Sequence, residues 1–217
     1  MIFLINAANA ALYADEIEQI QSLRFEVLVK DLKWEGLTSA GGLESDRFDG
    51  PSAVYIGIRE SDEVVAAIRL NKADRPTLTS EIFSHLVQFR ALPVGERVFD
   101  VTRLVVSPGR GKTFRKNRYS FDLLCAAMEF GLAGKLDCFT AVMPTRFFEL
   151  LQHTGSGIYP LGFPAGTGAD EHLAVAIPVV PRTLDCLYRF TGNSEPRLLS
   201  LQGAPLSARE AISALSA

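Results

Sequence analysis

The chain has 217 residues, which is enough for one sizeable domain with a hydrophobic core of its own. Hydrophobic residues make up 47% and charged residues 22% of it, so the composition is that of an ordinary globular protein rather than a disordered or fibrous one. The formal net charge of −3 excludes a general affinity for nucleic acid or anionic lipid, and any basic site must therefore be local.

The N-terminal half predicts a strand, a helix and a hairpin. Residues 2–6 are a short apolar run typical of a buried strand, without the basic start of a signal peptide. From Asp15 the apolar positions recur every three or four residues, as on one face of a helix, and glycines then mark a loop over residues 36–42. The strand-like runs 53–60 and 64–70, joined by three polar residues, indicate a hairpin.

The C-terminal half alternates strands with helices only in part. We expect a short helix over 81–89, a central strand over 97–106, a helix with an apolar stripe from Phe121 to Leu132, and strands over 138–143 and 174–180 on either side of a helix over 146–152. This order predicts an α/β fold of the α+β type, with a mixed sheet covered by helices. Residues 1–180 are the predicted domain. Residues 181–217 are a C-terminal extension that begins with a helix and is either part of the same domain or a loose tail.

Two arginines interrupt the apolar strands of the predicted sheet. Arg69 ends the run VVAAI and Arg103 lies inside FDVTRLVV, where an unpaired charge is energetically costly. The segment LESDRFD supplies two acids, Asp46 and Asp49, as partners. The sequence leaves open whether these charges form a structural ion pair or a binding site.

Strand alternation makes a prediction about the faces of the central strand. It places Arg103 on the same face as Val101, and it places Asp100 and Thr102 on the opposite face. Arg103 and Asp100 are therefore expected to point away from each other.

A basic loop with two glycines, SPGRGKTFRKNR, joins the central strand to the next helix over residues 107–118. Such a loop at a helix N-terminus can hold phosphate through its backbone N–H groups, the helix dipole and its cationic side chains. A solvated surface loop is the other interpretation. Its basic residues are Arg110, Lys112, Arg115, Lys116 and Arg118.

Several classes of protein are not supported. The three cysteines, Cys125, Cys138 and Cys186, are odd in number and show no CxxC spacing, which favours a reducing cytoplasm over a disulfide framework or a zinc site. The chain has no GxSxG, Walker, GxGxxG or HExxH motif. No apolar run approaches the length of a membrane span, so we expect no membrane insertion. The net charge of −3 leads us to expect no nucleic-acid partner.

Four blocks, LRFEVLVKDLKW, ESDRFD, AIRL and FDVTRL, resemble the autoinducer synthases that make acyl-homoserine lactones for bacterial quorum sensing. The resemblance runs from about residue 15 to about residue 180 and implies a fold similar to the GNAT acyltransferases, a three-layer α/β/α sandwich with a mixed central sheet. Leu28 stands where that family usually has phenylalanine, and Asp100 stands where it usually has glutamate. The matching residues are Arg24, Trp34, Asp46, Asp49, Arg69, Asp100 and Arg103.

The resemblance implies two substrates, S-adenosylmethionine and an acyl thioester carried by coenzyme A or by acyl carrier protein. The acyl group passes to the amine of S-adenosylmethionine, and the carboxylate of the product then displaces methylthioadenosine and closes a lactone. No metal or redox cofactor is required. The basic loop suits the phosphates of coenzyme A and an acidic carrier protein equally well.

The resemblance also implies roles for the residues. Asp46 and Asp49 hold the ammonium of S-adenosylmethionine and Trp34 holds its adenine or sulfonium. Asp100 is the candidate general base, and Arg103 orients the substrate or the acids. The full set expected to bind S-adenosylmethionine is Arg24, Leu28, Trp34, Asp46, Asp49 and Arg69. The candidates for an apolar acyl slot, each of which could instead be a core residue, are Phe83, Thr102, Thr140, Met143 and Phe147.

Two other functions remain open at this point. One is a GNAT-type N-acyltransferase that acylates another amine from acyl-coenzyme A and forms no lactone. The other is a non-catalytic sensor of small molecules on the same fold. The joint presence of Trp34, Asp46, Asp49 and Arg69 favours the synthase over the N-acyltransferase, which does not need all four. The sensor would bind S-adenosylmethionine or the acyl thioester without turnover.

Overall fold

Seven strands form one sheet in the order β1-β4-β5-β6-β7-β9-β8 in the computed structural model, which describes residues 1–108, 118–198 and 211. Only the β6–β7 pair is parallel, so the predicted mixed sheet is confirmed. The strands are β1 (Ile2–Ile5), β4 (Val54–Glu60), β5 (Glu63–Ala73), β6 (Gly95–Val106), β7 (Cys138–Pro144), β8 (Tyr159–Pro160) and β9 (His172–Pro178).

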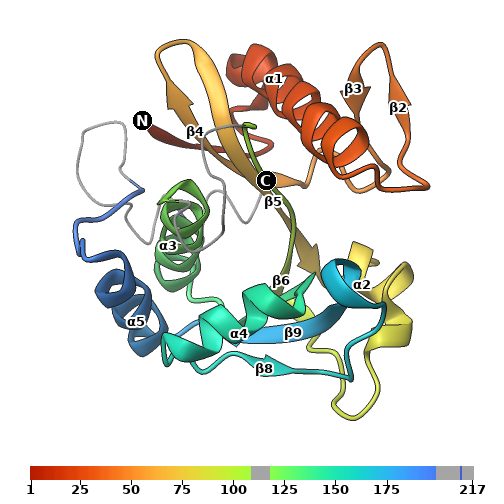
Figure 1. Cartoon of the computed structure of the whole chain (residues 1–217). Coiled ribbons are helices and arrows are strands. Elements are labelled where there is room, and N and C mark those ends of the chain that lie inside the picture. The colour runs from red at the N-terminus through yellow and green to blue at the C-terminus, as the bar shows by residue number, and fades with distance from the viewer. Residues whose placement is uncertain (109–117, 199–210, 212–217) are drawn as a thin grey trace.

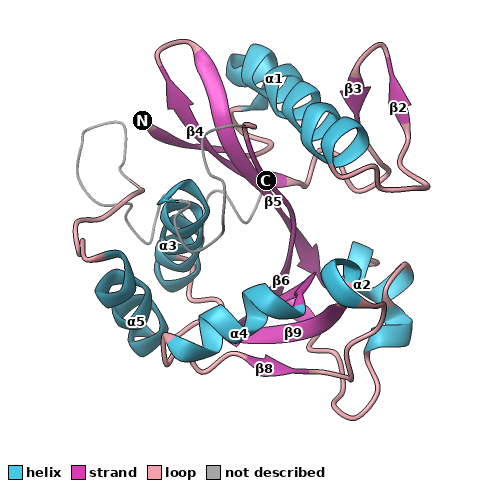
Figure 2. Cartoon of the chain, viewed as in Figure 1, coloured by secondary structure: helices cyan, strands magenta, loops and turns pink. Residues whose placement is uncertain are grey.

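Helices cover both faces of the sheet, as the α/β/α expectation requires (Figures 1 and 2). Strand alternation sorts the side chains: Ala67 of β5 packs with Ile20 of α1, whereas its neighbour Ile68 packs in the cluster that contains α3. The helices are α1 (Ala14–Arg24) and α2 (Leu78–Glu81) on the first face, and α3 (Arg118–Ala133), α4 (Thr145–His153) and α5 (Pro181–Thr191) on the second. In the part of the chain that the structure describes, no helix has the length and apolar character needed to cross a bilayer.

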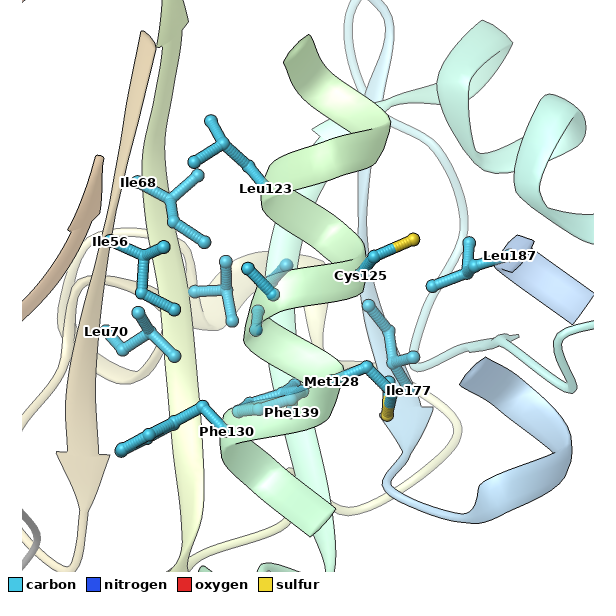
Figure 3. Packing of buried hydrophobic residues seen from close by; sticks show 14 of the residues in the cluster. Ile56, Ile68, Leu70, Leu123, Cys125, Met128, Phe130, Phe139, Ile177 and Leu187 are labelled. Atoms are coloured by element: carbon cyan, nitrogen blue, oxygen red, sulfur yellow. The ribbon is translucent and has the colours of Figure 1, made fainter. Parts of the chain in front are cut away.

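Helix α3 is buried on two sides. Leu123 and Phe130 face Ile56, Ile68 and Leu70 of the sheet, while Cys125 and Met128 face Leu187 of α5 and Ile177 of β9 (Figure 3). A helix that is apolar around most of its circumference belongs inside a core. The expected apolar stripe of this helix is therefore confirmed. Apolar residues also occupy the side of the helix that faces α5, because that side is buried as well.

The described part of the C-terminal extension packs on α3. The helix expected at its start is α5, and beyond it the backbone N–H groups of Arg197 and Leu198 donate to the Glu129 carboxylate at 2.9 and 2.7 Å. The Arg197 guanidinium donates to Asp122 at 2.9 Å. Residues 181–198 thus share the core of the preceding domain.

The prediction of a helix over residues 81–89 is wrong. A capping box between Thr77 and Ser80 starts α2 earlier, and a separate 3-10 turn follows over Ser84–Leu86. The N–H groups of residues 88, 89 and 90 all donate to the carbonyl of Leu161, so they are not available for a continuing helix. The last strand also begins and ends two residues earlier than expected, because Pro181 opens α5.

A short hairpin begins inside the segment expected to be a loop, residues 36–42, and ends two residues beyond it. Strands β2 (Ser39–Ala40) and β3 (Leu43–Glu44) pair across Gly41 and Gly42, which have φ values of 60° and 84°. A two-residue hairpin turn with positive φ at both central positions favours glycine at both. This turn directs Glu44 and the acids after it back toward α1 and the sheet.

We predict that Gly162→Ala destabilises the protein. A methyl group at Gly162 would overlap the carbonyl oxygen of Leu86, so the 3-10 turn and the segment around Leu161 would have to separate, at a cost of about 1–3 kcal/mol in the free energy of unfolding. Gly50→Ala is the matched control, because no heavy atom lies within 4 Å of a methyl group there. Denaturant unfolding of both variants measures the difference, and equal stabilities would contradict the close approach.

Candidate functional site

Three arginines and three carboxylates meet on the α1 face of the sheet. The side chains of Arg24 in α1 and Arg69 in β5 are fully buried, and that of Arg103 in β6 is 6% exposed. The carboxylates come from β3 and the turn that follows it. We call these six residues the arginine–carboxylate network: Arg24, Arg69, Arg103, Glu44, Asp46 and Asp49.

Asp49 pairs with both Arg24 and Arg69. It accepts from Nη1 and Nη2 of Arg24 at 2.7 and 2.9 Å and from Nη1 of Arg69 at 2.7 Å. The hydroxyl of Tyr55 adds a further hydrogen bond at 2.8 Å. Burial by itself raises the pKa of Asp49, but the hydrogen bonds and charges of the two arginines outweigh burial and hold that pKa far below its usual range.

Asp46 and Glu44 complete the pairing. Asp46 accepts two hydrogen bonds from Arg69 at 2.6 and 3.0 Å and one from Arg103 at 2.7 Å. Glu44 pairs with Nε of Arg24 and accepts from Nη2 of Arg103 at 3.1 Å. The structural ion pair that the sequence left open therefore exists, and cations balance anions within it.

The predicted orientation of Arg103 is wrong. Its side chain lies on the same face as Thr102, not on the opposite face, because Arg103 has φ of 55° and sits at a bulge. The register shows the extra residue: Ala67 pairs with Val105, but Arg69 pairs with Thr102. A bulge breaks the two-residue alternation and turns one more side chain toward the face that carries the site.

Asp100 lies on this face outside the network. Its Oδ1 accepts from the hydroxyls of Thr79 and Thr140 at 2.7 and 2.9 Å, and its Oδ2 accepts from the backbone N–H of Thr79 at 3.0 Å. Burial raises the pKa of Asp100 above its usual range, and the hydrogen bonds from the threonines offset that rise only in part. A cavity of about 370 Å³ is lined in part by Thr77 and by Thr140, which donates to this carboxylate.

Two residues of the expected S-adenosylmethionine set lie apart from the charges. Trp34 is 49% exposed, and its backbone N–H donates to the Leu28 carbonyl at 2.9 Å as a π-helical segment, Phe25–Asp31, ends. The side chain of Leu28 is buried in the apolar cluster beneath α1. Trp34 is therefore available to a ligand, whereas Leu28 packs in the core.

The five acyl-slot candidates do not meet on one face. Thr102 accepts from Arg69 at 3.1 Å and Thr140 donates to Asp100, whereas Met143 and Phe147 lie in the core on the α3 face. Phe83 packs near Leu86 on the α1 face. The reason is alternation in β7, which turns Thr140 and Met143 to opposite sides of the sheet.

Arg110, Lys112, Arg115 and Lys116 lie outside the described residues. Arg118 begins α3 as an exposed side chain and pairs with Asp122 one turn later at 3.2 Å.

Sequence reasoning missed three residues of the site. Glu44 stands inside the acidic segment that drew attention, but only the glycine turn shows that it points inward. Tyr55 lies in a strand where an aromatic residue is ordinary, so nothing in the pattern marks its hydroxyl. Thr79 follows the capping residue Thr77 in PTLTS, a helix-start signal, but nothing in the spacing indicates its contact with Asp100, 21 positions later.

Comparison with known proteins places this site in a family. The family model for autoinducer synthases matches residues 9–185. The isovaleryl-homoserine lactone synthase of Bradyrhizobium diazoefficiens is 30% identical over 208 residues, covering 96% of this chain and 92% of that protein. The acyl-homoserine-lactone synthase of Pantoea stewartii subsp. stewartii is 34% identical over 200 residues, covering 84% and 92%.

A solved structure shares the whole fold. The structure of a CoA-dependent acyl-homoserine lactone synthase, BjaI, with SAM and isopentyl-CoA superposes with a TM-score of 0.83 at 29% identity, covering 100% of this chain and 98% of that one. The structure of the same protein with MTA gives the same values.

We predict that Asp49→Asn lowers the free energy of unfolding by about 3–5 kcal/mol at pH 7, because it leaves buried guanidinium groups without their partner. The folded-state pKa of Asp49 is depressed, so its stabilising effect is present above the unfolded pKa of about 4 and is lost as pH falls below it. The deficit of the variant should therefore begin to shrink as pH falls from about 5 to about 3.

Thermal unfolding across this range, with the exposed Asp62→Asn as control, measures the effect. A deficit that stays constant with pH would show that the carboxylate charge of Asp49 is not what stabilises the network.

Proposed function

The chain belongs to the autoinducer synthase family, and from this premise we propose that it is an acyl-homoserine-lactone synthase. In this reaction an acyl group passes from a thioester to the amine of S-adenosylmethionine. The carboxylate of the acylated intermediate then attacks its own γ-carbon, methylthioadenosine leaves, and the lactone closes. The family match and the two synthase relatives support the assignment.

The observation that carries the proposal is the separation of two kinds of acid on one face of the sheet. Asp46 and Asp49 are paired with arginines, whereas Asp100 contacts only uncharged donors among the partners that the described residues provide. Charge pairing serves to bind a zwitterion, and an unpaired buried carboxylate serves to accept a proton. N-acylation of an amino acid needs both.

The amino-acid head of S-adenosylmethionine is assigned to the network. The ammonium and the carboxylate of the amino-acid head are adjacent, so their binding site needs an anion next to a cation. Oδ2 of Asp46 and Nη2 of Arg103 lie 2.7 Å apart and provide this pair. Asp46 is also the most exposed acid of the network, at 17%. The exposed face of Trp34 suits the sulfonium or adenine, a contact worth about 0.5–2 kcal/mol.

Asp100 is assigned as the general base. A carboxylate whose pKa is held far down, like that of Asp49, cannot accept a proton from an ammonium group at neutral pH, whereas burial raises the pKa of Asp100. Asp100 takes the proton directly or through one water, the free amine attacks the thioester carbonyl, and the thiol leaves. Lactone closure is intramolecular and requires chiefly that the chain be folded into attack geometry. These steps use no metal or redox cofactor.

We assign acyl-coenzyme A as the donor, with a short branched acyl chain. The support is similarity over the full chain to BjaI, which is CoA-dependent and was solved with isopentyl-CoA, and to the isovaleryl-homoserine lactone synthase. The three buried cysteines are free, in keeping with a reducing cytoplasm, which is where we propose that the protein acts.

The first test is turnover. We expect the purified protein, given S-adenosylmethionine and isovaleryl-coenzyme A, to release methylthioadenosine together with an acyl-homoserine lactone, detected by mass spectrometry. Straight-chain acyl-coenzyme A and acyl-carrier-protein donors form the comparison panel. Release of free thiol without methylthioadenosine would point instead to a plain N-acyltransferase. Faster turnover with acyl-carrier-protein donors would overturn the assignment of acyl-coenzyme A as the donor.

The second test concerns Asp100. Asp100→Asn keeps the shape of the side chain but removes its basicity, so kcat should fall by about 10²–10⁴-fold while the affinity for S-adenosylmethionine changes little. Steady-state kinetics and calorimetric titration separate the two quantities. A large loss of affinity for S-adenosylmethionine with little loss of kcat would show that Asp100 acts in substrate binding and not in proton transfer.

A further inference from the structure

The carboxylate of Asp100 is held from two sides by one residue. Thr79 donates from its backbone N–H to Oδ2 at 3.0 Å and from its hydroxyl to Oδ1 at 2.7 Å. Donors on both oxygens prevent rotation of the carboxylate about its terminal bond. Thr140 donates to Oδ1 only, at 2.9 Å, so it supports the position of that oxygen without defining the plane.

The local sequence explains why Thr79 can make both contacts. In the capping box of α2, Thr77 accepts from the N–H of Ser80 at 3.3 Å, and the Ser80 hydroxyl accepts from the N–H of Thr77 at 2.8 Å. The N–H of Thr79 lies in the first turn and has no intrahelical acceptor, so it is available to Asp100. The residue is 1% exposed, which keeps water from replacing these bonds.

We propose that Thr79 is a positioning residue for the reaction: it orients the Asp100 carboxylate and sets how readily that carboxylate takes a proton. This inference rests on the proposed function, in which Asp100 is the base. Thr79 acts through Asp100 and need not touch the substrate. In this proposal α2, a single turn of helix, holds the catalytic carboxylate in position through Thr79.

Among the residues that the structure describes, the hydrogen-bonding and cross-strand neighbours of Asp100 are uncharged. They are Thr77 at the N-cap of α2, Thr79 in α2, Thr140 from β7 and Asn71 from β5. Two charged residues on the same face of β5 and β6, Arg69 and Arg103, are both paired with carboxylates of the network. Hydrogen bonds from threonines are therefore the main local means of stabilising the ionised form of Asp100.

Thr79→Val tests the proposal, because valine has the same shape and keeps the backbone N–H but lacks the hydroxyl. Losing a donor to the ionised carboxylate raises the pKa of Asp100, so the base stays protonated to higher pH. We expect the acidic limb of the kcat–pH profile to move up by about 1 pH unit, the size of one hydrogen bond to a charged group, and kcat at pH values on that limb to fall roughly 10-fold.

Two variants control for a merely structural effect. Thr79→Ser keeps the hydroxyl and should restore the wild-type acidic limb. Thr183→Val removes another hydroxyl from a threonine that is also 1% exposed, but one that donates to the carbonyls of Ser156 and Pro178, and it should leave the limb unchanged. An unmoved limb in Thr79→Val, or an equal shift in Thr183→Val, would overturn the proposal.

A second readout does not depend on turnover. The ionised form of Asp100 loses more than the protonated form when the hydroxyl is removed, so the stability deficit of Thr79→Val should grow as pH rises through the pKa of Asp100. The deficit of Thr183→Val should not depend on pH. A pH-independent deficit in Thr79→Val would refute the coupling even for an inactive protein, whereas failure of the proposed function would appear as absence of lactone from the wild type.

Discussion

Six paired charges on the α1 face of the sheet, most of them buried, constrain the rest of the N-terminal half of the molecule. Each charge of the arginine–carboxylate network is tolerable inside the protein only because it has a partner of opposite sign within hydrogen-bonding distance. Arg24 belongs to α1, Arg69 to β5 and Arg103 to β6, while the acids come from one short stretch of chain. Removing any element would strand a charge, so helix, strands and turn are held in one arrangement.

On this face the fold gives two carboxyl groups opposite pKa shifts and therefore different chemistry. Asp49 and Asp100 are both buried aspartates, yet arginines hold the pKa of Asp49 down and burial raises that of Asp100. The difference comes from neighbours: guanidinium groups stabilise a carboxylate with full charges, and threonines do so with dipoles alone. One acid thus suits binding of a charged group, and the other suits transfer of a proton.

Two irregularities in the backbone make this face possible. The glycine turn between β2 and β3 brings Glu44 inward. The bulge at Arg103 places its guanidinium on the α1 face, whereas regular strand alternation would place it on the opposite face. Left-handed backbone is readily accessible to glycine but uncommon for arginine. At Arg103 the ion pairs with Glu44 and Asp46 accompany this conformation, as expected where strain is maintained at a functional site.

The sequence by itself determined the mixed sheet, its covering helices and the identity of most charged residues in the site, because periodicity and the cost of an unpaired charge in an apolar strand are local properties. Only the tertiary structure decided which charges pair, that Arg103 and Asp100 share a face, that the acyl-slot candidates lie on opposite faces, and that Thr79 holds Asp100. These facts depend on a bulge and on contacts between residues about 20 or more positions apart, and no short-range pattern encodes where two distant segments meet.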